Sequence, residues 1–149
     1  MRLTRAGEYA VRCVIYLSMS GRDVLVSRKE IASKAAIPAQ FLAKIAQELA
    51  KAGIIEIRQG VRGGFILIKD PADITLLDVV ETMIGEIYLN DCVCRPSSCD
   101  ASKTCSVHKV WQYARKQLRE TLSSVTFASL IEEGACFPPE PKAGRSKQS

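Results

Sequence analysis

The cysteine spacing in the stretch 91–108 constrains this chain more than any other sequence feature. The stretch holds four of the six cysteines and the only histidine, separated mostly by small and polar residues. A loop of this composition has no apolar core of its own and stays mobile unless its thiols are tied together. Its potential ligands are Cys92, Cys94, Cys99, Cys105 and His108.

Several chemistries could tie these thiols together. A disulfide is disfavoured, because we expect no secretory signal, and clustered cysteines in a reducing cytoplasm more often bind metal or act as redox thiols. Zinc sites usually use closely paired cysteines, whereas four and five residues separate Cys94, Cys99 and Cys105. Thiolates also suit iron–sulfur clusters, so the cluster, zinc and redox-thiol interpretations all stay open at this point.

Charge is distributed unevenly along the 149 residues. Residues 1–69 carry 12 Lys and Arg against 5 Asp and Glu, whereas residues 70–134 carry 6 against 10. A basic half beside an acidic half suggests that the first half binds a polyanion, although a solvated basic surface has the same composition. No apolar run is long enough to span a membrane, so we expect a cytoplasmic protein with no membrane partner.

The N-terminal segment predicts a buried helix. Thr4 can cap a helix that runs to about Ser20, and its apolar residues occupy more than one side, which is typical of a helix packed between two partners. Cys13 is most simply a small core residue of this helix. Glu8 interrupts the apolar pattern near the helix start, where a carboxylate is favourable in any helix.

The next segment has the pattern of a helix-turn-helix. Ser27 opens a capping box for a second helix, and Pro38 suits the first turn of a third helix. The third helix has an apolar stripe on one face and amide and basic groups on the other. In a helix-turn-helix this helix would present Ala39, Gln40 and Lys44 to base edges and phosphates.

Two apolar segments, 54–57 and 65–68, predict strands joined by a hairpin with three glycines and two arginines. A hairpin of this kind directly after a helix-turn-helix makes a wing whose arginines can reach the DNA backbone or minor groove. We therefore expect a mainly α (α+β) fold, a winged helix-turn-helix with a two-stranded wing, that binds double-stranded DNA. The predicted DNA contacts are Arg2, Ser27, Arg28, Ala39, Gln40, Lys44, Arg58 and Arg62.

The C-terminal half predicts a capped helix, the cysteine loop and a long helix. Thr75 and Asp78 form a weak capping signal, and a long helix starts near Ser106. Apolar residues at steps of three and four along the long helix form a narrow stripe, which favours a twofold homodimer, although the helix could instead pack on its own domain. The stripe is Val107, Val110, Trp111, Ala114, Leu118, Leu122 and Val125.

The domain organisation follows from these elements. We predict a DNA-binding domain over residues 1–70 and a cysteine-loop sensor with its dimerisation helix over residues 71–133. Residues 126–131 predict a short closing helix. Residues 134–149 are rich in Pro, Lys and Ser and predict a disordered tail, in which Cys136 has no assigned role.

These parts, in this order, resemble the Rrf2 family of bacterial transcription regulators over about residues 1–133. The motifs that carry the resemblance are Met1-Arg2-Leu3-Thr4 with Glu8-Tyr9-Ala10-Val11, Lys51-Ala52-Gly53-Ile54, Arg62-Gly63-Gly64-Phe65, Ile74-Thr75-Leu76-Leu77-Asp78-Val79-Val80 and the cysteines. The resemblance implies that the loop holds an iron–sulfur cluster, 2Fe–2S or 4Fe–4S, through three thiolates, and that the long helix pairs two subunits.

Carried over position by position, the resemblance implies that the thiolate ligands are Cys94, Cys99 and Cys105. Two family patterns differ in the fourth ligand. One uses a histidine three residues after the last cysteine, which is His108, and the nitric-oxide-sensing branch uses an acidic residue from the other subunit, which is Glu8. We favour Glu8, because it otherwise interrupts an apolar helix. Cys92 departs from the pattern and could replace Cys94.

The predicted function is a homodimeric transcription regulator, more specifically a repressor, that binds a palindromic operator. Its DNA affinity would depend on a cluster that senses nitric oxide, redox state or iron–sulfur status. The alternatives are a cluster-free or zinc- or thiol-sensing winged-helix regulator and an iron–sulfur electron-transfer protein. We expect no enzyme, because no general base and orienting partner can be assembled around the single histidine.

Overall fold

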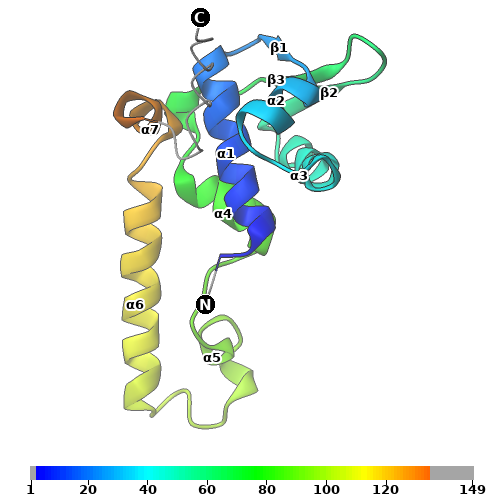
Figure 1. Cartoon of the computed structure of the whole chain (residues 1–149). Coiled ribbons are helices and arrows are strands. Elements are labelled where there is room, and N and C mark those ends of the chain that lie inside the picture. The colour runs from blue at the N-terminus through cyan, green and yellow to red at the C-terminus, as the bar shows by residue number, and fades with distance from the viewer. Residues whose placement is uncertain (1–2, 135–149) are drawn as a thin grey trace, which may run out of the picture.

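Helix α1 (Arg5–Ser20) runs through the middle of the structure, a computed structural model that describes residues 3–134 (Figure 1). It packs against α3 (Ala39–Lys51), α4 (Leu76–Ile84) and α7 (Phe127–Glu133). Because α1 has neighbours on several sides, Ala10, Cys13, Val14 and Leu17 are all buried. The predicted helix between packing partners is confirmed, and so is Cys13 as a core residue.

The sheet has three strands in the order β1-β3-β2, all antiparallel. The two predicted wing strands correspond to β2 (Ile55–Arg58) and β3 (Gly64–Leu67), and the sequence prediction missed β1 (Leu25–Val26). Gly64 permits the added pairing, because a Cβ there would lie 2.1 Å from the carbonyl oxygen of Val26. The winged helix-turn-helix is confirmed, with β1 tying the wing to the segment before α2 (Arg28–Lys34).

Side-chain caps start several of the helices where the sequence predicts them. The hydroxyls of Thr4, Ser27 and Thr75 accept hydrogen bonds from backbone N–H groups in the first turns of α1, α2 and α4. The Asp78 carboxylate also accepts from the Thr75 N–H, which completes a capping box. Each cap satisfies donors that a helix start otherwise leaves unpaired.

The main core extends beyond the first 70 residues. Ile74, Val79 and Phe127 belong to the same buried cluster as the residues of α1 and α3. The backbone of residues 74–76 also pairs with that of residues 125–127, through Leu76 N to Val125 O and Phe127 N to Ile74 O, both 2.9 Å. The predicted division at residue 70 stays a prediction, while the predicted closing helix is α7.

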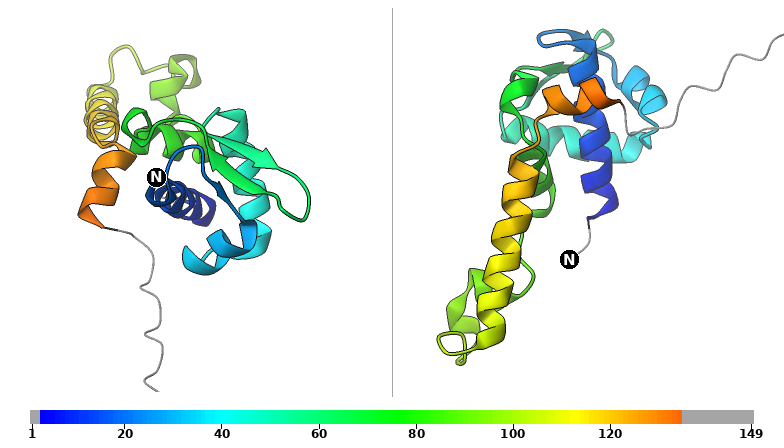
Figure 2. Two further views of the ribbon diagram at one scale, coloured as in Figure 1. Left: turned by 90° about the horizontal axis from the view of Figure 1, so that it is seen from above. Right: turned by 90° about the vertical axis from the view of Figure 1, so that its left-hand side faces the viewer.

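We call α1–α4, β1–β3 and α7 the body, and residues 91–123 the arm. The arm consists of the one-turn helix α5 (Asp91–Cys94), a 3-10 turn (Pro96–Ser98), a loop and the long helix α6 (Ser106–Ser123). Figures 1 and 2 show the arm projecting from the body, with α5 at its far end. A further 3-10 turn (Pro71–Asp73) precedes α4.

Ion pairs and apolar contacts fix α6 to α4. The Arg119 guanidinium pairs with Glu81, and Arg115 pairs with Glu86 at 2.6 Å. Leu118 and Leu122 pack on a small apolar cluster of α4 and the segment after it. The alternative that α6 packs on its own domain therefore holds for its C-terminal half, which lies on α4, and for its start, where His108 lies against α5. Residues 135–149 of the predicted tail, including Cys136, lie outside the described residues, and so does Arg2.

Candidate functional site

Helix α3 presents the side chains that the sequence predicts for reading DNA. Leu42, Ile45 and Leu49 face the core, so the opposite face of the helix is turned to solvent. Ala39, Gln40 and Lys44 are exposed on that face, as predicted for base and phosphate contacts. The helix starts directly after Pro38, and Ala39 and Gln40 of its first turn are exposed, which suits an approach of this end of the helix to a groove.

The arginines of the wing differ in how they are held. Arg58 forms a 2.5 Å ion pair with Glu56 on the same strand. Arg62 is exposed in the turn between β2 and β3. Arg28 lies with its guanidinium 5.6 Å from the centre of the Phe65 ring and donates to the Gln59 side chain at 3.4 Å. Arg28 therefore links the start of α2 to the wing as well as being a predicted DNA contact.

A hollow of about 620 Å³ separates α2 from α3 beside the predicted reading face. Its polar lining includes Arg28, Lys29 and Ser33, and the last two were not predicted from the sequence. Both are exposed and four residues apart on α2, so they share one face of that helix. That spacing was the signal in the sequence that could have found them. Ser27 is the α2 cap, and its hydroxyl is engaged by Glu30 N at 3.2 Å.

Short turns order the cysteine stretch more than its composition predicts. Helix α5 is capped by Asn90, and the Ser102 hydroxyl donates to the carbonyl of Pro96 at 2.8 Å. Cys105 N donates to Ala101 O at 2.7 Å immediately before α6 begins. Local hydrogen bonds of the backbone and of the Ser102 hydroxyl therefore supply what apolar contacts do not, and the mobility expected of a loop whose thiols are not tied together stays a prediction.

Three of the four cysteines face one pocket of about 330 Å³ at the start of α6. Cys92, Cys99, Cys105 and His108 all contribute to its lining. Cys92 and His108 are each 7% exposed, and the Cys92 sulfur lies 3.1 Å from His108 Nδ1. Among residues 3–134, no three His, Cys, Asp or Glu side chains are already arranged to hold a metal ion. The soft donors therefore surround one pocket without converging on a point.

The side chain of Cys94 does not contribute to that pocket. Its sulfur lies 3.8 Å from a carboxylate oxygen of Glu86. The other oxygen of Glu86 accepts from Arg115 at 2.6 Å, and Arg115 Nε donates to the carbonyl of Ile87 at 2.7 Å. The structure thus brings Cys99, Cys105 and His108 of the predicted ligands together and leaves Cys94 on another side of α5.

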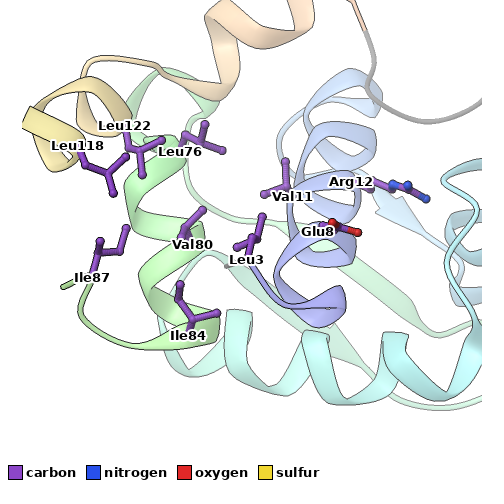
Figure 3. A pocket seen from close by; sticks show the side chains of 10 residues that line it. All are labelled: Leu3, Glu8, Val11, Arg12, Leu76, Val80, Ile84, Ile87, Leu118 and Leu122. Carbon is purple, nitrogen blue, oxygen red and sulfur yellow. The ribbon is translucent and has the colours of Figure 1, made fainter. Parts of the chain in front are cut away.

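Glu8 is exposed on α1 and lies in a different place from the cysteine pocket. It borders an apolar groove of about 550 Å³ between α1, α4 and α6 (Figure 3). The groove that Glu8 borders and the pocket that the cysteines line therefore share no residue within one chain; the sequence prediction assigned Glu8 to the other subunit. The groove is lined by Leu3, Glu8, Val11, Arg12, Leu76, Val80, Ile84, Ile87, Leu118 and Leu122.

The free part of α6 presents an apolar face to solvent. Val107, Val110 and Tyr113 are 48%, 58% and 64% exposed, and their spacing of three residues aligns them. The predicted stripe therefore splits, because Leu118 and Leu122 face the body while Val107 and Val110 do not. Tyr113 extends the exposed face and was not included in the predicted stripe.

A winged helix-turn-helix with exposed amide and basic side chains on its third helix and wing defines a DNA-binding module of transcription regulators. A family model described as Rrf2, iron-dependent transcriptional regulator, matches residues 3–133. The chain belongs to the Rrf2 family, and it is a DNA-binding transcription regulator and not an enzyme.

Two relatives and one solved structure are similar to the chain over most of its length. The chain is 38% identical over 136 residues to an HTH-type transcriptional regulator of Aquifex aeolicus, covering 88% of this chain and 93% of that protein. It is 31% identical over 136 residues to the regulator NsrR of Geobacillus kaustophilus, covering 91% and 92%. The structure of T. potens IscR superposes with a TM-score of 0.70 at 24% identity, covering 89% and 88%.

No helix within residues 3–134 combines the length and the apolar character that a bilayer span requires.

Proposed function

We propose that this regulator is a homodimeric repressor whose DNA affinity is controlled by an iron–sulfur cluster bound in the cysteine loop. The observation that carries the proposal is the gathering of soft donors around one pocket at the start of α6. That pocket lies in the arm, and the arm is joined to the DNA-binding body by α6 (Figure 1). A ligand bound there can therefore affect the position of the body.

The donors of the pocket fit a cluster chemically. Thiolates and imidazole are the ligands that iron–sulfur clusters accept. Cys99 and Cys105 belong to every ligand set we consider, and Cys94 is the third thiolate predicted from the sequence. The fourth ligand is Glu8 of the other subunit or His108, and the position of His108 in the pocket lining supports the second choice. When bound, the cluster would supply a redox- and nitric-oxide-reactive centre.

Two apolar surfaces support the homodimer. The exposed face of α6 and the groove between α1, α4 and α6 lie on the same chain, and no part of residues 3–134 covers either of them. In a twofold dimer each chain can place its α6 against the partner. Both surfaces are then buried in each of the two chains. Glu8 at the groove edge would then lie near the partner's arm, which is the arrangement that a shared ligand requires.

Arg115 and Arg119 couple the arm to the body. Arg119 pairs with Glu81 in α4, and Arg115 pairs with Glu86 just after α4. Helix α4 in turn packs directly on α1. Ligation of the loop at the far end of α6 can therefore change the angle between the two bodies of a dimer. Two recognition helices must match one duplex turn of about 34–36 Å, so a small change has a large effect. A coupling free energy of about 1–3 kcal/mol changes affinity roughly 5- to 150-fold.

The predicted DNA contacts fit a palindromic operator. Gln40 and Lys44 on α3 are exposed for the major groove, and Arg62 in the wing turn is exposed for the backbone or minor groove. Phosphate contacts make binding weaken steeply with salt whichever sequence is read. The basic balance of residues 1–69 supports this electrostatic contribution.

The test is an anaerobic absorption spectrum with iron and sulfide analysis, followed by titration with nitric oxide while DNA binding is measured. We expect a coloured protein that is bleached by nitric oxide and loses DNA affinity in step. A colourless zinc protein, or a protein that keeps its DNA affinity when the cluster is destroyed, contradicts the proposal.

A further inference from the structure

The cysteine loop has one more thiol than a three-thiolate set needs. Cys92 and Cys94 are two residues apart on the one-turn helix α5, so their side chains leave the helix in directions about 200° apart. Both cannot face the same pocket while α5 keeps this form. The proposed function does not depend on which of the two supplies the third thiolate.

Cys92 faces the pocket. Its side chain is buried, contributes to the pocket lining together with Cys99 and Cys105, and lies 3.1 Å from His108 Nδ1. A tetrahedral metal bound to one sulfur and one imidazole nitrogen places those two atoms about 3.6 Å apart. The Cys92–His108 distance is within about half an ångström of that value, so a small adjustment brings both atoms to one metal.

Cys94 is held on the other side of α5. Its sulfur contacts Glu86, and Glu86 is fixed by its 2.6 Å ion pair with Arg115 of α6. Bringing Cys94 into the pocket requires turning α5, which removes Cys92 from His108 and separates Cys94 from Glu86. The structure therefore contains two distinct thiol environments within three residues.

We propose that Cys92, Cys99 and Cys105, with His108 beside Cys92, are the metal-facing donors, and that Cys94 is an outer thiol held by Glu86. The identity of the bound group, an iron–sulfur cluster, rests on the proposed function. The assignment replaces a four-residue gap before Cys99 by a six-residue gap. It also leaves the Cys94 thiol accessible to modifying reagents while the group is bound.

The test compares Cys92→Ser with its matched control Cys94→Ser, both in the full chain carrying Cys136→Ser. After anaerobic reconstitution with ferrous iron and sulfide, we expect Cys92→Ser to lose most bound iron and sulfide, and Cys94→Ser to keep the parent content. The reverse result, loss in both variants, or loss in neither overturns the assignment and leaves the proposed function standing if the parent protein binds a cluster.

Titration with cobalt(II) distinguishes failure of the ligand assignment from failure of the proposed function. If the parent protein takes up no iron and sulfide, the proposed function fails, and the thiolate-to-cobalt charge-transfer absorption still reports which cysteines face the pocket. We expect Cys92→Ser to weaken cobalt binding at least as much as the ~10- to 100-fold loss caused by removing a supporting partner of a metal ligand. Unchanged cobalt binding in Cys92→Ser overturns the assignment.

Alkylation of the reconstituted parent protein needs no loop variant. It therefore tests the assignment even if Cys92→Ser fails to fold. After a short exposure to iodoacetamide, mass spectrometry measures the labelling of each cysteine. Among the four loop cysteines, we expect Cys94 to be labelled first. Cys92, Cys99 and Cys105 should be protected until the metal is removed. Protection of Cys94 together with early labelling of Cys92 contradicts the assignment.

Discussion

The cysteines of the body and those of the arm differ in almost every physical respect. Cys13 is completely buried in α1 between apolar neighbours, and burial raises its pKa to about 12. The arm cysteines range from buried to exposed and lie among polar residues and short turns. A thiol with a strongly raised pKa is a poor nucleophile and ligand, so the same residue type is structural in one region and available for chemistry in the other.

The two regions also differ in what holds them together. The body has a continuous core that includes residues from α1, α3, β3, α4 and α7. The arm shares a small apolar cluster with α4 near Ile87, and beyond it α5 and the loop rely on capping and turn hydrogen bonds. Regions with few buried apolar contacts open at low free energy. We therefore expect the far end of the arm to gain more stability from a bound group than the body does.

The largest effect on stability is predicted for a variant that removes the contact between α7 and the rest of the body. Phe127→Ala deletes a fully buried ring that packs with α1, and we expect the free energy of unfolding to fall by about 3–5 kcal/mol. Urea denaturation followed by circular dichroism measures it. The control is Val61→Ala in the exposed wing turn, expected within about 0.5 kcal/mol of the parent. Equal effects of the two variants would place α7 outside the body's cooperative unit.

The next effect concerns the exposed face of α6. Val110→Glu places a carboxylate on the face of α6 that we propose is buried in both chains of the dimer. We expect this variant to weaken association by at least about 2 kcal/mol. Sedimentation velocity over a range of protein concentrations measures the change. Gln112→Glu introduces the same group on another side of the helix and should leave the dimer intact. If the Gln112 variant dissociates and the Val110 variant does not, the interface lies elsewhere.

A third prediction separates base reading from phosphate binding on the body. Gln40→Ala should lower affinity for the operator by about 1–3 kcal/mol and leave non-specific binding unchanged. Arg62→Ala should weaken both and lower the slope of log affinity against log salt by about one. Fluorescence anisotropy with specific and unrelated duplexes measures both. Lys51→Ala, at the far end of α3 and paired with Glu48, is the control and should change little.

A fourth prediction uses the buried thiol of the body. Because the folded pKa of Cys13 is raised from 9.0 to about 12, the unfolded chain loses this proton first when the pH rises above 9. The contribution to stability is complete below pH 9 and is lost by up to about 1.4 kcal/mol per pH unit between pH 9 and pH 12. Urea denaturation from pH 8 to pH 10.5 should show a shallower decline for Cys13→Ala than for the parent. Parallel curves would contradict the burial effect.

The smallest effect on the body is expected from removing the group bound by the arm. Chelation under anaerobic conditions should change the free energy of unfolding of the body by less than about 0.5 kcal/mol. In the same sample, trypsin cleavage after the exposed Lys103 should become faster, because the far end of the arm loses its ties. Cleavage after the exposed Arg22 of the body is the internal control. Destabilisation of the body by several kcal/mol would remove the distinction between the two regions.

Local signals explain why most of the body could be predicted from the sequence. Thr4, Ser27 and Thr75 act within three residues of their own positions, so their capping roles follow from the sequence alone. Strand β1 was missed because two residues have no periodicity, and it forms only by pairing with β3 some 40 residues later. The packing of Phe127 on α1 depends likewise on a contact between distant parts of the chain.

The arm was harder to predict, because its chemistry depends on side-chain direction. Cysteine spacing identified the loop, but only the turn of α5 distinguishes Cys92, beside His108, from Cys94, beside Glu86. Spacing does not carry that information, since Cys92, although it departs from the family pattern, could replace Cys94. The exposure of Glu8 at an apolar groove also depends on how α1, α4 and α6 pack.

The backbone pairing of Thr75 with Thr126 gives the chain a particular architecture. The segment between these two residues, which consists of α4 and the arm with the chain that joins them, begins and ends at nearly the same point of the body. The loop and the N-terminal half of α6 can therefore change in length or ligand type without altering the strands and helices that approach DNA. One DNA-reading framework can in this way be combined with different input segments, provided that the exchanged segment begins after α4, which belongs to the body, and ends before the backbone hydrogen bonds beside Thr126.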